Sequence, residues 1–240
     1  MRIEPNPCFV LHARPYRETS LMADVFSLPE GRITLVARGA RSGRKNSRQS
    51  LLQPYQKVLL GWYGRGEMGT VSQAEASGVA YPLQGRRLIS GFYLNELILR
   101  LLHRHESHVE LFEAYEKALG SLSSGADEQA TLRIFEKRIL ESVGFGLVLD
   151  HDIHTREPIR DDSIYHYRIE SGPTLAAENT DQENTVPVHG LTLISLKDET
   201  LSDPVSLSEA RKLMRAIITR VAGPKPLASR DLYQSYLKFR

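Results

Sequence analysis

The fold of this chain follows from residues 31–41, which have the sequence GRITLVARGAR. Ile33, Leu35 and Ala37 alternate there with Arg32, Thr34, Val36 and Arg38. An alternation of period two predicts a half-buried β-strand, and the glycines around it favour turns. Short runs of the same kind recur elsewhere in the first 80 residues, at 8–12, 21–26, 58–63 and 68–74.

About five short strands in this length suit a small closed barrel. The OB-fold is the commonest nucleic-acid-binding barrel of that size. We therefore expect an OB-fold domain over residues 1–80.

The period changes to about four after Arg86, which predicts helices. Ser107 with Glu110 forms a capping box for a second helix, and Asp127 can cap a third that Gly144 ends. We expect these three helices to pack as a bundle. Residues 150–204 predict short strands and loops. A helix that Ser206 caps together with Glu209 is expected after them, and a last helix near Ser229. The fold class is α+β, with a helical-bundle domain over residues 81–240 that carries an irregular insertion at about 150–204.

Composition limits the classes of function. The single cysteine, Cys8, excludes an internal disulfide and a cysteine-rich zinc site. No apolar run approaches the ~20 residues that cross a bilayer, and no signal-peptide pattern is present, so we expect a cytoplasmic protein. No Walker loop or G-x-S-x-G motif occurs, and His151 with His154 lacks the second half of a metal site. We expect neither an enzyme nor a cofactor.

The charges are unevenly distributed. Residues 1–80 carry 11 Lys and Arg against 6 Asp and Glu, residues 121–200 carry 7 against 15, and residues 201–240 carry 8 against 3. Residues 31–66 contain no Asp or Glu at all. Such basic ends favour polyanions, and basic loops bind phosphates with little sequence preference. The predicted DNA-binding cations of this amino-terminal region are Arg32, Arg38, Arg41, Arg44, Lys45, Arg48 and Arg65.

Two interpretations stay open for this region. It is either a phosphate-binding surface, which the absence of acidic residues favours, or an ordinary solvated loop. Tyr55, Trp62 and Tyr63 either stack on unpaired bases or belong to the core, and the apolar neighbours of Trp62 favour the core.

Two further basic sets lie on predicted helices. Arg211 and Arg215 face away from the apolar stripe of the Ser206 helix, as either an auxiliary DNA contact or a solvated face. Arg133 and Lys137 lie beside Leu132 and Phe135 on the third helix. Such a set suits an acidic peptide with apolar end groups, although the residues alone favour ordinary helix solvation.

Four segments resemble the RecO family of bacterial recombination mediators, most closely its proteobacterial branch. They occur in family order over nearly the whole chain: FVLHARPYRETS (9–20), GRITLVARGAR (31–41), GFYLNEL (91–97) and GPKPLASRDL (223–232). The resemblance implies an OB-fold followed by a helical domain. Some family members carry a four-cysteine zinc finger in the region that matches residues 150–190, where this chain has no cysteine, so we expect no metal.

The resemblance also implies a function. It predicts binding of single- and double-stranded DNA, annealing of complementary strands, and help, together with RecR, in loading RecA onto DNA coated with the single-stranded DNA-binding protein, SSB. It places Arg133 in the helix that binds the acidic carboxy-terminal tail of SSB, beside Leu132, Phe135 and Lys137. The alternatives are a protein-interaction adaptor and an RNA-binding OB-fold protein, since no residue pattern identifies a reader of the 2′-hydroxyl.

Overall fold

The computed structural model describes residues 2–42, 49–64, 67–176 and 184–238. The chain forms two compact units, the first from residues 1–124 with 227–240 and the second from residues 125–226. The domain boundary that the sequence predicts near residue 80 stays a prediction.

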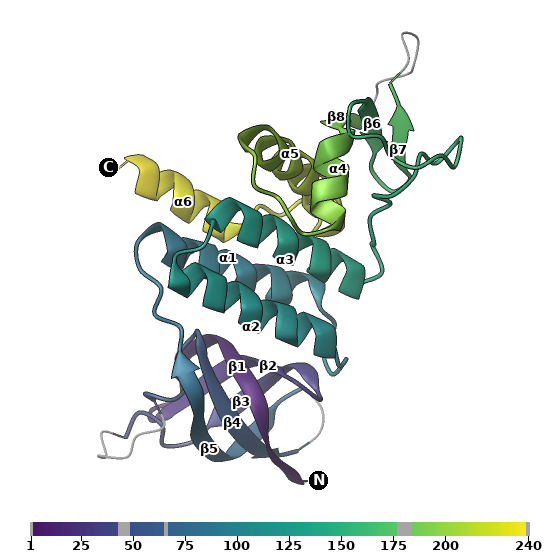
Figure 1. Cartoon of the computed structure of the whole chain (residues 1–240). Helices are drawn as coiled ribbons and strands as arrows, with labels where there is room; N and C mark the ends of the chain where they lie inside the picture. Colours follow the sequence, from purple (N-terminus) through teal and green to yellow (C-terminus); the bar gives the residue numbers. More distant parts are fainter. Residues whose placement is uncertain (1, 43–48, 65–66, 177–183, 239–240) are drawn as a thin grey trace. The chain divides into compact units, whose positions relative to one another are not determined.

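The first unit begins with a closed five-stranded barrel in the order β1-β2-β3-β5-β4, visible in Figure 1. Antiparallel pairing of β1 with β4 closes the barrel, while β3 and β5 run parallel. This arrangement is that of an OB-fold and confirms the predicted α+β class. The strands are β1 (Arg2–Tyr16), β2 (Ser20–Ser27), β3 (Gly31–Ala37), β4 (Gln56–Tyr63) and β5 (Gly69–Ala80).

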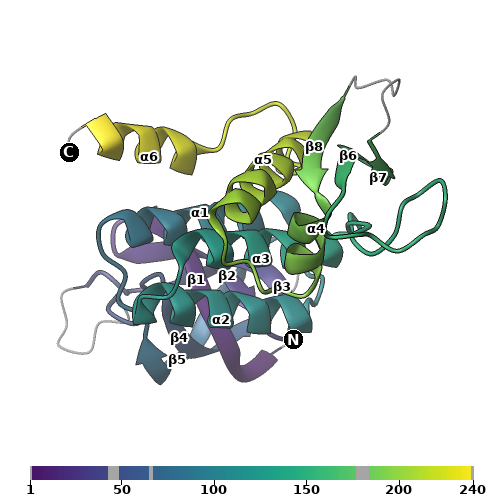
Figure 2. The ribbon, with the colours of Figure 1, turned by 45° about the horizontal axis from the view of Figure 1, so that its top comes forward.

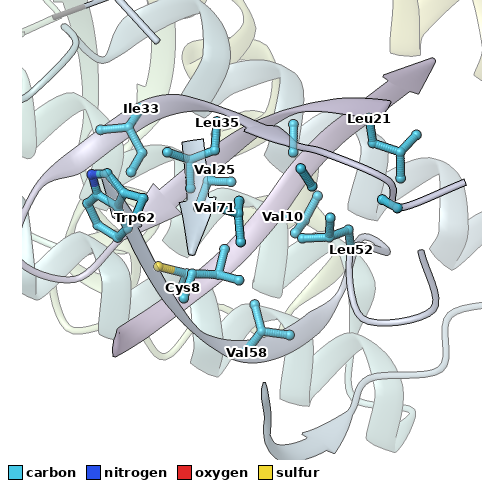
Figure 3. Close-up of a cluster of buried hydrophobic side chains, with 14 residues drawn as sticks. Cys8, Val10, Leu21, Val25, Ile33, Leu35, Leu52, Val58, Trp62 and Val71 are labelled. Carbon is cyan, nitrogen blue, oxygen red and sulfur yellow. The ribbon is translucent and has the colours of Figure 1, made fainter. Parts of the chain in front are cut away.

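The alternation in β3 determines what fills the barrel. Ile33, Leu35 and Ala37 belong to the barrel core and are almost fully buried. Figure 3 shows Ile33 and Leu35 in the same cluster as Cys8 of β1 and Trp62 of β4. The intervening side chains of β3, Arg32 among them, therefore point away from the barrel core, and Arg38 follows directly after the strand.

Helices α1 (Arg86–Leu101) and α2 (Val109–Ser124) cover one face of the barrel (Figure 1). Phe9 and Phe26 of the barrel pack against Phe112 and Tyr115 of α2 in tilted and edge-to-face arrangements, with ring centroids 5.1–6.3 Å apart. Asn95 of α1 donates to the carbonyl oxygen of Leu11 at 2.8 Å. The final helix, α6 (Ala228–Lys238), packs on α1 and completes this unit.

The second unit contains α3 (Glu128–Ser142), α4 (Gly190–Lys197), α5 (Pro204–Val221) and a three-stranded sheet, whose strand β8 packs on α4 and α5 (Figure 2). Its strands are β6 (Ile164–Arg168), β7 (Gly172–Leu175) and β8 (Thr185–His189). Short strands were expected here, but α4 was not. The predicted three-helix bundle is divided between the units: α1 and α2 belong to the first, whereas α3 packs with α5 in the second.

One of three predicted helix caps is confirmed. Asp127 accepts a hydrogen bond from the Ala130 amide at the start of α3. The Ser107 cap is wrong, because α2 begins at Val109 and its first backbone bond runs from the Phe112 amide to the His108 carbonyl. The Ser107 hydroxyl donates to the Leu28 carbonyl. The Ser206 cap is also wrong: Asp203 caps α5 and accepts from the amides of Val205 and Ser206, each at 3.0 Å.

Candidate nucleic-acid interface

A pocket of about 500 Å³ opens at one end of the barrel, and we call it the barrel-end pocket. Three segments far apart in the sequence meet there: the β1–β2 turn, the end of β3 and the start of β5. In an OB-fold, oligonucleotides bind on the face of strands 2 and 3 and at the loops that follow strands 1 and 4. The pocket is lined by Tyr16, Arg17, Thr19, Ser20, Val36, Arg38, Gly39, Met68, Gly69 and Thr70.

The lining of the pocket combines positive charge with an aromatic ring. The exposed guanidinium groups of Arg17 and Arg38 supply the charge, and the lining holds no carboxylate. The guanidinium of Arg17 lies over the ring of Tyr16, 5.3 Å from its centroid. One arginine can donate hydrogen bonds to two oxygens of the same phosphate, and a partly exposed ring can stack on a base. The pocket therefore offers what one nucleotide of an unpaired strand needs.

The local backbone holds these groups in place. Arg17 has a left-handed conformation, with φ of 52°, which turns the chain between β1 and β2. The amide of Arg41 donates to the carbonyl oxygen of Thr19 at 2.8 Å. The segment after β3 is thereby tied to the β1–β2 turn, and the exposed Arg41 is held at the edge of the pocket.

The amino-terminal cations predicted from sequence have different positions. Arg38 lines the pocket and Arg41 lies beside it. Arg32 is at the other end of β3, six residues or ~20 Å away, where its Nη1 donates to the Leu102 carbonyl at 3.2 Å. Burial, and then the charge of Arg104, lower the pKa of Arg32. The remaining four, Arg44, Lys45, Arg48 and Arg65, lie outside the described residues.

The aromatic residues divide as follows. Trp62 and Tyr55 are buried, as the core interpretation predicts. Tyr63 is 49% exposed, and Arg2 lies over its ring at 5.8 Å. Sequence reasoning missed Tyr16 and Arg17, although their place between two alternating segments signalled a turn that a barrel would present at its end.

The predicted basic face of α5 exists in the second unit. Arg211 and Arg215 are exposed, while Leu213, Met214 and Ile217 on the other side of the helix are buried. Arg220, at the end of the same helix, pairs with Glu170 at 2.7 Å. Whether this face touches DNA stays a proposal.

The residues predicted to bind a peptide tail are on α3, and all four side chains are buried: Leu132, Arg133, Phe135 and Lys137. Arg133 Nη2 pairs with Glu136 Oε1 at 2.7 Å. Lys137 Nζ donates to the Lys197 carbonyl at 2.8 Å and to Glu199 Oε1 at 3.1 Å. Both cations thus already have partners within their own unit.

Neither a metal site nor a membrane-spanning helix is found among the residues that the structure describes. No three His, Cys, Asp or Glu side chains gather there in a way that could hold a metal ion. Within the same residues, no helix is both long and apolar enough to span a membrane.

The chain is similar to known proteins over nearly its whole length. A family model described as "Recombination protein O N terminal" matches residues 1–79, and one described as "Recombination protein O C terminal" matches residues 82–231. The DNA repair protein RecO of Nitrosospira multiformis is 42% identical over 235 residues, covering 98% of this chain and 96% of that protein. That of Nitrosococcus oceani is 43% identical, with 98% and 94% covered. The Coxiella burnetii protein is 38% identical over 231 residues, with 96% and 98% covered.

These matches extend over both units of the chain. This chain belongs to the RecO family of DNA repair and recombination proteins.

Proposed function

We propose that this protein binds single-stranded DNA at the barrel-end pocket and anneals complementary strands, without covalent chemistry. The observation that carries the proposal is the meeting of Arg17, Arg38 and Tyr16 in one pocket at the ligand-binding end of an OB barrel. Membership of the RecO family supports the wider role in recombinational repair.

Annealing is opposed by the repulsion between the phosphates of two strands. Arginines that neutralise phosphates release the counterions bound to DNA and reduce that repulsion. Arg17 and Arg38 act on one strand in the pocket, and the exposed face of α5, with Arg211 and Arg215, offers a second basic surface for its complement or for a duplex. Base pairing then supplies the driving force.

The annealing rate of two complementary, fluorescently labelled oligonucleotides tests the proposal. The double variant Arg17→Gln/Arg38→Gln should anneal them more slowly than the wild type. Lys117→Gln, which removes an exposed charge from α2 of the same unit, is the matched control and should not change the rate. Equal rates for wild type and double variant would contradict the proposal. Faster annealing of RNA than of DNA strands would favour the RNA-binding alternative.

We also propose that α3 receives the acidic tail of SSB and so brings the barrel to SSB-coated DNA, where tethering raises the effective concentration. Support comes from the combination of Arg133 with the apolar Leu132 and Phe135. Because Arg133 is buried and paired with Glu136, a tail carboxylate has to replace Glu136 at its guanidinium.

This exchange gives two opposite expectations. Arg133→Ala should weaken binding of an SSB tail peptide but leave binding of naked DNA unchanged. Glu136→Gln should tighten peptide binding, because the competing carboxylate is gone. Calorimetric titration of the peptide, with circular dichroism to verify folding, measures both. Equal losses of peptide and DNA binding in Arg133→Ala would contradict the placement.

The final step of the proposal is the loading of RecA onto SSB-coated DNA together with RecR. It rests on the family alone and is tested by the rate of RecA filament formation on SSB-coated DNA. The rate should rise only when this protein and RecR are both present.

A further inference from the structure

The loop between α1 and α2, residues 102–108, lies directly against the barrel in the first unit. The amide of His105 donates to the Arg32 carbonyl at 3.1 Å, and the hydroxyl of Ser107 donates to the Leu28 carbonyl at 3.2 Å. Gly31 makes the contact still closer, because a Cβ there would overlap the carbonyl oxygen of Glu106. The β2–β3 turn and the α1–α2 loop are therefore held together as one structure.

This contact places two like charges side by side. Arg32 and Arg104 are paired by a β-bridge, yet each guanidinium has a backbone carbonyl as its hydrogen-bond acceptor. Arg32 Nη1 donates to Leu102, and Arg104 Nη1 donates to Glu67 at 3.3 Å. Among the described residues, no carboxylate lies within ion-pair distance of either group.

Arg32 also has one hydrogen-bond donor without an acceptor. Its Nε is buried and has no hydrogen-bond partner within the described residues. Burial and the charge of Arg104 both lower its pKa, and the charge of Asp24 opposes them as the smallest of the three effects. One oxygen of Asp24 already accepts from Thr34 at 2.8 Å. Two adjacent arginines without a carboxylate partner cost electrostatic energy that a bound anion offsets.

The position of this pair relates it to the barrel-end pocket. Arg104 binds the carbonyl of Glu67, and the next residue, Met68, lines the pocket. A strand that leaves the pocket past the β4–β5 turn therefore meets Arg104 next. His103 and His105 of the same loop are exposed on either side of it.

We infer that Arg32 and Arg104 together bind one backbone phosphate of the DNA strand held in the barrel-end pocket. The nucleic-acid surface thereby extends from the barrel onto the α1–α2 loop. A guanidinium fork matches the oxygens of a phosphate, and two such forks can hold it from two sides. The inference rests on the proposed DNA binding of the pocket.

The test measures the affinity for a fluorescent oligothymidylate by anisotropy over a series of KCl concentrations. Arg104→Gln keeps an amide donor for the Glu67 carbonyl but removes the charge. It should weaken binding and make the slope of log K against log [salt] shallower by about 0.7, the loss of one phosphate contact on a single strand. Arg104→Lys should keep the wild-type slope, and so should the control Lys117→Gln.

Comparison with Arg38→Gln separates this inference from the proposed function. If Arg38→Gln makes the slope shallower and Arg104→Gln does not, the phosphate site is wrong while the pocket stands. If neither variant changes the slope, DNA binding at the pocket is wrong as well. If Arg104→Gln weakens binding of an acidic peptide but not of the oligothymidylate, the anion at this site belongs to a protein, and the inference is overturned.

Discussion

Gly31 is the residue at which the contact between barrel and α1–α2 loop can be tested. Its φ of +63° lies in the left-handed region, and its missing Cβ leaves room for the Glu106 carbonyl. Alanine at this position should therefore carry two costs, one for the backbone conformation and one for displacing the loop. Gly39 offers a matched control, because its φ is +67° but a Cβ there meets nothing within 4 Å.

The two costs can be estimated separately. A left-handed alanine costs about 1–2 kcal/mol, which is all that Gly39→Ala should lose. Displacing the loop at Gly31 also breaks the bonds from the His105 amide to Arg32 and from Ser107 to Leu28. At about 1 kcal/mol for each hydrogen bond, Gly31→Ala should lose a further ~2 kcal/mol.

Urea unfolding measures this difference. The only tryptophan, Trp62, is in the barrel core and reports on unfolding of the first unit. With an m-value of about 2 kcal/mol/M, the midpoint for Gly31→Ala should fall about 1 M below that for Gly39→Ala. Equal midpoints would refute the reasoning, since the loop contact would then contribute nothing beyond the backbone conformation.

Three further outcomes follow from single residues. Burial raises the pKa of the Cys8 thiol to about 12, so a thiol reagent at neutral pH should modify Cys8 only as fast as the barrel unfolds; rapid labelling of the native protein would contradict this. Burial also raises the pKa of the Tyr115 phenol. The free energy of unfolding should therefore fall as pH rises above about 10, because the phenol ionises there only in the unfolded chain. A free energy of unfolding that stays constant at alkaline pH would contradict this expectation. Asp203→Ala should destabilise α5 by about 1 kcal/mol in thermal unfolding. Because its hydrogen bonds to Ser206 lower the pKa of Asp203, this difference should decrease as pH falls below about 4, and an unchanged difference at lower pH would contradict the assignment.

The barrel is the part of the fold that the sequence determines most clearly. Inward residues such as Ile33 and Leu35 recur every second position, and that period is sufficient to predict which side of a strand is buried. Barrel closure depends on the pairing of β1 with β4 and of β3 with β5, which no local pattern encodes.

The pocket shows why the site was predicted only in part. The charge of the segment after β3 indicated Arg38, but Tyr16 and Thr70 come together only when the barrel closes. Arg104 was missed for the same reason, because its position beside Arg32 depends on how the α1–α2 loop docks.

The cap of α5 and the cations of α3 show two other limits. Asp203 followed by Pro204 is a strong signal for the start of a helix. Ser206 with Glu209, one turn later, also has the spacing of a capping box and therefore misled the prediction. Glu209 instead forms a hydrogen bond with His189, and the distance from His189 Nδ1 to Glu209 Oε1 is 2.6 Å. The periodicity of α3 predicted its apolar face, but it could not show that Lys137 is buried, because its partner Glu199 is 62 residues away.

The salt dependence of single-strand binding by the double variant Arg17→Gln/Arg38→Gln tests the central claim most directly. If the two arginines of the barrel-end pocket together bind one phosphate, the slope of log K against log [salt] should become shallower by about 0.7 relative to wild type and to Lys117→Gln. A slope and an affinity equal to those of the wild type, in a variant that circular dichroism shows to be folded, would contradict the claim that DNA binds at this pocket.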